Sequence, residues 1–293
     1  MEEGMKRSLM LATVVAGLSV LSYAEPLLLE KAGNVLSPGT LEAGIGNFAY
    51  QTDTTEFINE AGTVVLTHHN AAVTVPFYAR FAFTDSIETY VSIPHSYLFA
   101  KTEPAGAEAT SITDAGLADP SLAGKYSFQY SGWDISGAAE VSIPAGKASS
   151  EFNSGFRQGL NITPLFAAGR KFGAIGLNTN LSYRVSGEYE DEAKVKTDTG
   201  NELLVGAGIE VPCRNNEKLL WLGEVLYKNV TEHKLAGIIQ QDTEGEHINL
   251  IVGARYNKGS IKAKLGIDFA VGEEKHRDYD YRIVAGLTYL INL

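Results

Sequence analysis

Apolar and polar residues alternate with a period of two along most of this chain. In the segment IKAKLGIDFAV, residues 261–271, every second residue is apolar, and Lys262, Lys264 and Asp268 lie between the apolar positions. In an extended chain this alternation places all the apolar side chains on one face of a strand and the charged ones on the other. Helical periodicity is nearly absent after residue 36, so the sequence predicts an all-β protein.

The alternating segments have the length that a membrane-crossing strand needs. Each is close to or above the roughly 9–11 residues with which a tilted strand spans a bilayer. Twelve strands are predicted, at 39–51, 70–84, 86–100, 117–129, 133–144, 157–168, 173–188, 200–212, 218–230, 246–256, 261–272 and 278–291.

The connections between these segments are alternately short and long. Five are tight and rich in turn residues, at 84–86, 130–132, 169–172, 214–217 and 257–260. The others are longer, at 52–69, 101–116, 145–156, 189–199, 231–245 and 273–277. In bacterial outer-membrane barrels the short turns lie in the periplasm and the long loops lie outside the cell.

The apolar face could form the core of a β-sandwich or could face lipid. A sandwich has no reason to sort its loops by length, and the apolar-face aromatic residues gather at strand ends, as in the aromatic girdles of membrane barrels. The sequence therefore predicts a transmembrane antiparallel up-and-down β-barrel of about 12 strands. The girdle candidates are Phe81, Phe83, Phe128, Tyr130, Trp133, Phe166, Tyr256 and Tyr289 near the short turns, and Tyr183, Tyr227, Tyr279 and Tyr281 near the loops.

The N-terminus has the pattern of a secretory signal peptide. Lys6 and Arg7 precede an apolar run from Leu9 to Leu21, and Ser22-Tyr23-Ala24 follows with small residues at the positions that a signal peptidase reads. We predict a signal peptide over 1–24, an N-terminal periplasmic segment over 25–38 and the barrel over 39–293. Cys213 is the only cysteine, so an internal disulfide is excluded.

Composition narrows the class of protein further. The 293 residues carry a formal net charge of −11, which argues against nucleic acid as a partner. Charged residues make up 20% and apolar residues 44%, so disorder is not expected. After the predicted signal peptide there is no run of 18 or more apolar residues, and alternating barrel strands give only a weak hydropathy signal.

The stretch GLADPSLAGKYSF, residues 116–128, resembles the pattern GLGDxxLxxKYxF of the family named for the meta-pathway of phenol degradation. IPAGK (143–147) and SGFRQGLNITPLFAAG (154–169) are similar to the family's Pro-x-Gly loop and the strand after it. Ala118 replaces the usual second glycine, and Leu293 stands where such barrels commonly end in Phe. The resemblance implies an outer-membrane channel or uptake protein, with aromatic compounds among its solutes.

The sequence offers little catalytic chemistry. Gly44-Ile-Gly46 and Gly206-Ala-Gly208 are fragments of a dinucleotide loop that lie in strands, where glycine more simply marks a bend or a close packing point. His68-His69 is the only histidine pair, and its rings would point to opposite sides of an extended chain. None of the six histidines is followed by Ser two residues later, so the His-x-Ser motif of the barrel phospholipases is absent. We predict no enzyme, no metal site and no cofactor.

The charged face of the strands would line the lumen. A twelve-stranded barrel is intermediate between small filled barrels and open porins, so its lumen should be narrow. The charges would serve either as structural ion pairs in place of an apolar core or as a constriction that selects solutes. The predicted lumen residues are Arg80, Glu88, Lys125, Asp134, Glu140, Arg184, Glu202, Glu210, Glu224, Arg255, Lys262, Lys264, Asp268, Asp280 and Arg282.

Four of the bases, Arg255, Lys262, Lys264 and Arg282, lie on the last three predicted strands. Most of the acids lie on other strands, so we expect a basic wall that faces an acidic one. The resulting transverse field would orient dipolar or anionic solutes such as aromatic acids. The alternative is that the charges pair across the lumen and close it.

Two functions are compatible with these patterns. The first is a channel that admits small solutes, and the second is a structural or surface-interaction barrel with a closed lumen. No predicted loop is long enough to form a folded domain, which favours transport. The expected partners are outer-membrane lipid, the barrel-insertion machinery during biogenesis and a small-molecule solute.

The protein should therefore fractionate with bacterial outer membranes. A folded barrel resists mild detergent, so unboiled and boiled samples should migrate differently on an electrophoresis gel. Recovery in the soluble periplasmic fraction, with no shift on boiling, would contradict the assignment.

Overall fold

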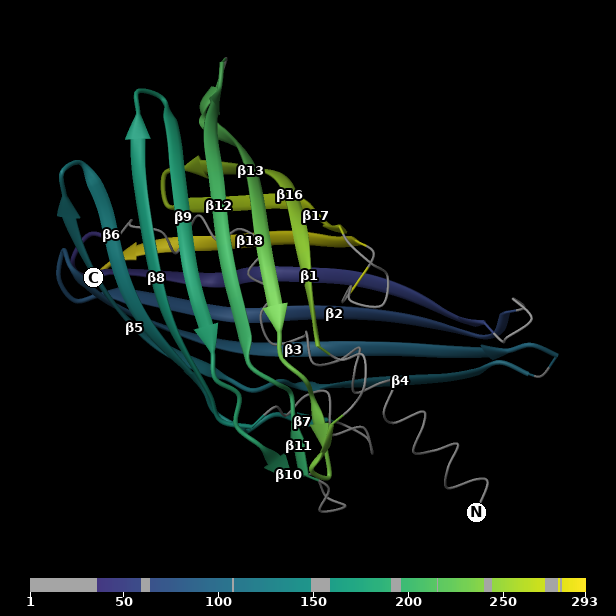
Figure 1. Cartoon of the computed structure of the whole chain (residues 1–293). Coiled ribbons are helices and arrows are strands. Elements are labelled where there is room, and N and C mark those ends of the chain that lie inside the picture. Colours follow the sequence, from purple (N-terminus) through teal and green to yellow (C-terminus); the bar gives the residue numbers. More distant parts are fainter. Residues whose placement is uncertain are drawn as a thin grey trace.

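The main sheet of the protein closes on itself into an antiparallel barrel (Figure 1). The computed structural model describes residues 36–58, 64–106, 108–148, 159–190, 196–214, 216–239, 244–271, 279 and 281–293. Pairing of β1 with β18 joins the first strand to the last, and pairing of β2 with β3 completes the ring. The twelve positions are filled by β1 (Thr40–Ile58), β2 (Val64–Ala82), β3 (Ile87–Pro104), β4 (Thr110–Leu117) together with β5 (Ser121–Tyr130), β6 (Trp133–Ser142), β8 (Asn161–Phe172), β9 (Ile175–Arg184), β12 (Glu202–Cys213), β13 (Asn216–Val230), β16 (Gly245–Lys258), β17 (Ile261–Val271) and β18 (Tyr281–Asn292).

This ring confirms the predicted twelve-stranded up-and-down barrel. The predicted signal peptide, 1–24, lies outside the described residues, as does most of the predicted segment 25–38. Within that segment Leu36 is buried, and its backbone N–H donates a 3.3 Å hydrogen bond to Glu88 Oε2. The described chain therefore approaches the interior of the barrel just before β1 begins.

Short turns join the strands at one end of the barrel. Ser131 and Gly132 connect β5 to β6 with φ values of 50° and 78°, the paired positive dihedrals of a type I′ hairpin turn. The predicted turn at 169–172 is wrong, because those residues belong to β8 and the turn lies at Gly173–Ala174. The positive φ of Gly173, 62°, is the conformation that this tight turn requires.

Strands β1 to β4 extend well past the others at the opposite end (Figure 1). The predicted loops 52–69 and 101–116 are therefore too long. β1 ends at Ile58 and β2 begins at Val64, while β3 ends at Pro104 and β4 begins at Thr110. The extensions are rich in Thr, which suits a strand, but do not alternate regularly between apolar and polar residues. Alternation marks a strand with one apolar and one polar face, so it misses a strand that carries polar residues on both faces.

The wall is interrupted between β4 and β5, where a single strand, 117–129, was predicted. Residues 118–120 belong to no strand, and Pro120 has no N–H to donate, although Ala118 N–H still donates to the carbonyl of Pro94. Asp119 Oδ1 accepts a 2.7 Å hydrogen bond from the N–H of Gly146, which fixes the connection after β6 against the break. The short strand β7 (Lys147–Ala148) then pairs with the last residues of β4.

A second, small sheet lies over the long-loop end of the barrel and was not predicted. Its four strands come from two predicted loops, 189–199 and 231–245. They are two or three residues long, below the length at which alternation can be recognised. The members are β10 (Tyr189–Glu190), β11 (Lys196–Asp198), β14 (Lys234–Leu235) and β15 (Ile238–Ile239).

The barrel has its apolar face on the outside. On β17 the side chain of Leu265 is 60% exposed, while Lys264 is 8% and Asp268 0% exposed. The same inversion is seen on β3, β5, β9 and β16, where exposed Phe, Leu, Ile, Val and Tyr alternate with buried polar residues. An apolar exterior around a polar interior is the arrangement of a barrel whose solvent is lipid.

No helix among the described residues is long and apolar enough to cross a membrane.

An arginine at Leu265, near the middle of β17, should destabilise the barrel by about 2–4 kcal/mol, because the charge would enter the hydrocarbon core. Ile261 begins the same strand on the same face beside the turn at 259–260, so Ile261→Arg should cost at most about 1 kcal/mol. Urea unfolding in lipid vesicles, followed by tryptophan fluorescence, measures both. Equal costs at the two depths would contradict a lipid-facing wall.

Candidate solute path through the barrel

The predicted lumen residues that the structure describes lie on the inner side of the wall. Asp280 lies outside the described residues. Asp134, Glu210, Arg255 and Lys262 are partly buried. The buried members are Arg80, Glu88, Lys125, Glu140, Arg184, Glu202, Glu224, Lys264, Asp268 and Arg282.

Near the short turns, Glu42 is the centre of an ion-pair network. Its Oε2 atom lies 2.8 Å from Nη2 of Arg80 and 2.9 Å from Nζ of Lys262, and its Oε1 accepts a 2.7 Å hydrogen bond from Thr288. Arg80 also lies 3.6 Å from Glu88. We call these residues and Lys125 the Glu42 network, which joins β1, β2, β3, β5, β17 and β18.

The register of the sheet builds this network. Glu42 faces Arg80 directly across β1 and β2, and Glu88 faces Lys125 across β3 and β5, where their side chains meet at 2.9 Å. Directly opposed side chains on one face of a sheet lie within contact distance. Glu42 was not among the predicted lumen residues. It lies on the same face of the first predicted strand as Thr40 and Gly44, and this position could have identified it.

A second cluster surrounds Asp268 toward the long-loop end. Asp268 Oδ2 lies 2.5 Å from Nη2 of Arg282 and accepts a 2.6 Å hydrogen bond from the hydroxyl of Tyr279, while Asn249 donates to Oδ1 at 2.8 Å. The Arg282 guanidinium also lies 4.5 Å from the centre of the Tyr279 ring. Tyr279 was predicted to join the lipid-facing girdle, which is wrong, because it is only 2% exposed and its ring packs on Arg282.

Further pairs complete the charged lining. Glu202 lies 3.1 Å from Lys228 and 3.5 Å from Arg184, and Arg255 lies 2.9 Å from Glu210. Lys228 was not among the predicted lumen residues, although it has the same strand parity as Glu224, which was.

The predicted basic wall is therefore wrong. Arg255, Lys262 and Arg282 each contact a carboxylate on the same side of the barrel, so their charges are compensated locally. Opposite charges about 3 Å apart form a dipole, whose field falls off faster with distance than that of a single charge. The prediction failed because it counted charges by strand and did not include Glu42 or the registers of the paired strands.

Neutral polar side chains lie on the inner face of β5, β6, β8 and β9, among the charged Lys125, Glu140 and Arg184. The hydroxyls of Ser127, Ser136 and Thr163, both amide atoms of Asn161 and the amide oxygen of Asn180 have no hydrogen-bond partner among the described residues. We call these five residues the neutral arc. Buried polar atoms almost always find a partner in the protein or in ordered water. The groups of the neutral arc are therefore available to bind water or a polar solute.

A small apolar ridge lies on the inner face beyond β12. Leu222 of β13 and Ile251 of β16 are buried against each other with Leu220 beside them, and Leu226 of β13 is also buried. We call these four residues the apolar ridge. Leu222 and Leu226 lie two residues on either side of Glu224, so they were expected to face inward with it. An apolar patch on the inner wall was nevertheless not predicted.

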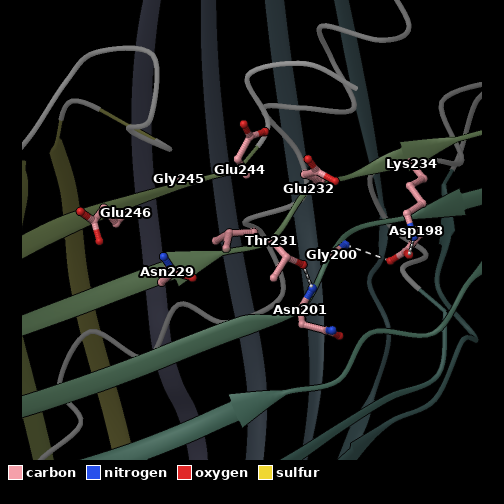
Figure 2. A pocket seen from close by; sticks show the side chains of 11 residues that line it. Asp198, Gly200, Asn201, Asn229, Thr231, Glu232, Lys234, Glu244, Gly245 and Glu246 are labelled. Carbon is pink, nitrogen blue, oxygen red and sulfur yellow. Dashed lines mark hydrogen bonds and ion pairs between the residues drawn. The ribbon is translucent and has the colours of Figure 1, made fainter. Parts of the chain in front are cut away.

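A pocket of about 580 Å³ opens at the long-loop rim, where β12, β13 and β16 meet the loops (Figure 2). Gly200 N–H donates a 3.0 Å hydrogen bond to Asp198, and Lys234 lies 3.9 Å from the same carboxylate. Among the described residues the lining holds one lysine and four carboxylates. The carboxylates are Asp198, Glu232, Glu244 and Glu246.

The described residues contain no group of three or more His, Cys, Asp or Glu that is arranged to hold a metal ion. His68 and His69 lie in β2 and have different partners. His68 Nδ1 lies 2.9 Å from the hydroxyl of Thr102, and His69 Nδ1 lies 3.3 Å from that of Thr54. The pair therefore serves the contacts between β1, β2 and β3.

Comparison with known proteins identifies a family and a fold. The family described as "Putative MetA-pathway of phenol degradation" matches residues 32–276, which is most of the chain. No curated protein sequence matches.

Solved structures with this fold include an outer-membrane channel of Pseudomonas putida F1, with a TM-score of 0.63 and 11% identity over 88% of this chain and 98% of that one. The transport unit of the autotransporter AIDA-I from Escherichia coli has a TM-score of 0.55 and 10% identity, over 96% of this chain and 97% of that one. The translocator domain of the autotransporter NalP from Neisseria meningitidis has a TM-score of 0.50 and 9% identity, over 95% of this chain and 96% of that one. At these identities the likeness concerns the barrel fold alone. That fold, together with the closed sheet and its apolar exterior, places the protein in the outer membrane.

Glu42→Gln should lower the free energy of unfolding by about 3 kcal/mol, because Arg80 and Lys262 would lose their shared buried carboxylate. Urea unfolding in vesicles measures the change. Glu103→Gln is the matched control, since Glu103 pairs with Lys101 at an exposed strand end and its loss should not change stability measurably. A Glu42→Gln barrel as stable as the control would show that the network is not structural.

Proposed function

Since the chain belongs to the MetA-pathway family of phenol degradation, we propose that it is a narrow outer-membrane channel for small solutes. The alternative is a barrel with a closed lumen that serves a structural or surface role. The two differ in one physical property, which is whether a continuous water-filled path crosses the barrel.

The neutral arc is the observation that carries the proposal. If the lumen were filled only by protein, its buried polar atoms would be expected to bond to one another, as the two carboxylate oxygens of Glu42 do with their neighbours. The neutral arc instead presents buried hydroxyl and amide groups without protein partners over four neighbouring strands. These groups are suited to exchange hydrogen bonds between water and a passing solute at little cost.

The inner wall also supports a preference for solutes with both a polar and an apolar edge. The apolar ridge on β13 and β16 is separated from the neutral arc by β12 alone. A hydroxylated aromatic compound could pack its ring on the ridge and keep its hydroxyl groups toward the neutral arc. This assignment agrees with the family's link to phenol degradation.

Net charge contributes little to selection in this proposal. Arg80, Lys228, Arg255 and Arg282 of the inner wall each lie beside a carboxylate within their own cluster. We therefore expect the pore to discriminate weakly between small cations and anions, unlike pores lined by rings of one charge.

Single-channel recording with engineered cysteines tests the path. In a Cys213→Ser background, Ser182→Cys places a nearly isosteric thiol on the inner face of β9, while Leu181→Cys places it on the exposed outer face. A negatively charged methanethiosulfonate reagent should lower the conductance of the Ser182→Cys channel in a step. The Leu181→Cys channel should be unaffected, because its thiol faces lipid.

Two outcomes would overturn the proposal. A folded wild-type barrel that never conducts would support the closed structural barrel. A Ser182→Cys barrel that is labelled, as shown by mass spectrometry, but keeps its conductance would show that ions do not pass this part of the wall.

A further inference from the structure

Arg170 of β8 lies on the lipid-facing side of the wall. Arg170 shares its strand parity on β8 with Phe166 and Phe172, which are 51% and 50% exposed. It lies three residues before the turn at Gly173, so it is at the periplasmic boundary of the membrane rather than at the bilayer centre. A charge is costly in hydrocarbon, but arginine near a strand end can reach the headgroups.

Two aromatic rings hold the guanidinium in place. Its Cζ atom lies 5.1 Å from the centre of the Phe172 ring and 5.7 Å from that of Trp133, and these two rings meet edge to face at 6.4 Å. The guanidinium also lies over Gly132 of the type I′ turn, where an added Cβ would be 3.7 Å from Cζ. Cation–π contacts on two sides fix the position of the group within the aromatic girdle.

The hydrogen-bonding capacity of this arginine is not used within the described protein. No carboxylate pairs with it, and its recorded contacts there are the two rings. The guanidinium differs in this from Arg80, Arg184, Arg255 and Arg282 of the inner wall, which all contact carboxylates. A planar cation with free donors at a lipid boundary is suited to bind two oxygens of a phosphate.

We infer that Arg170, Trp133 and Phe172 form a binding site for the phosphate group of a glycerophospholipid in the periplasmic leaflet. The rings would contact the glycerol and upper acyl carbons while the guanidinium binds the phosphate. The exposed hydroxyl of Ser131 in the adjacent turn is available as a further donor. An anionic lipid such as phosphatidylglycerol should bind more tightly than zwitterionic phosphatidylcholine, because its charge is not offset.

Trp133 provides a reporter inside the site. The chain has two tryptophans, so Trp221→Phe leaves Trp133 alone. This protein is refolded into vesicles of phosphatidylcholine that contain increasing fractions of dibrominated phosphatidylglycerol, or of dibrominated phosphatidylcholine as the reference lipid. Quenching of Trp133 then gives the relative affinity for the two lipids, and we expect about fivefold in favour of phosphatidylglycerol.

Arg170→Gln should abolish the preference, and Arg170→Lys should keep only part of it. Lys171→Gln is the matched control, because Lys171 is the next residue with the same charge but the opposite strand parity. Folding of each variant is checked by heat-dependent gel migration. An unchanged preference in Arg170→Gln, or an equal loss in Lys171→Gln, would show a general effect of surface charge and overturn the site. Loss of the preference on addition of soluble glycerol phosphate would identify a free phosphate ligand instead.

Discussion

Backbone hydrogen bonding in lipid is the constraint on which this fold depends. A strand edge inside a bilayer has no water to satisfy its N–H and C=O groups, so the sheet must close. Closure is made by β1 with β18, whose paired residues run from Thr40 with Asn292 to Thr52 with Tyr281. A bulge between Ile45 and Phe48 interrupts this seam. Gly44 lies beside the bulge, where a Cβ would lie 2.2 Å from the carbonyl oxygen of Leu287, so glycine allows the two strands to approach.

Closure also determines how the interior is stabilised. The apolar residues are used on the outside, so the inner wall is held by ion pairs and hydrogen bonds in place of a large apolar core. Unpaired charges in such a place are costly, and the cross-strand registers bring opposite charges together where they are needed. The remaining inner surface differs in character by sector, with neutral polar groups beside the charged ones on β5 to β9 and apolar groups on β13 and β16.

The sequence predicted the architecture well because two-residue alternation and turn chemistry are local. Strand β17 was expected at 261–272 and runs over Ile261–Val271, with Lys264 inside and Leu265 outside. The failures arise where a property is not local. Glu42 acquires its importance from Arg80 and Lys262, which are distant in sequence, and no spacing rule links the three. Tyr279 follows the apolar alternation of its neighbours, yet its ring lies inside because Arg282 and Asp268 provide its partners.

The Glu42 network has a consequence for the order of folding. Its members span almost the whole barrel in sequence: Glu42 is separated from Lys262 by 220 residues and from Thr288 by 246. Contacts of such long sequence separation form late, because the loop between them must first be closed. The carboxylate of the first strand gains its contacts with Lys262 and Thr288 only when the last two strands have arrived. Full coordination of that carboxylate is therefore coupled to the completeness of the chain, and a truncated barrel would leave Glu42 with Arg80 as its remaining partner in the network.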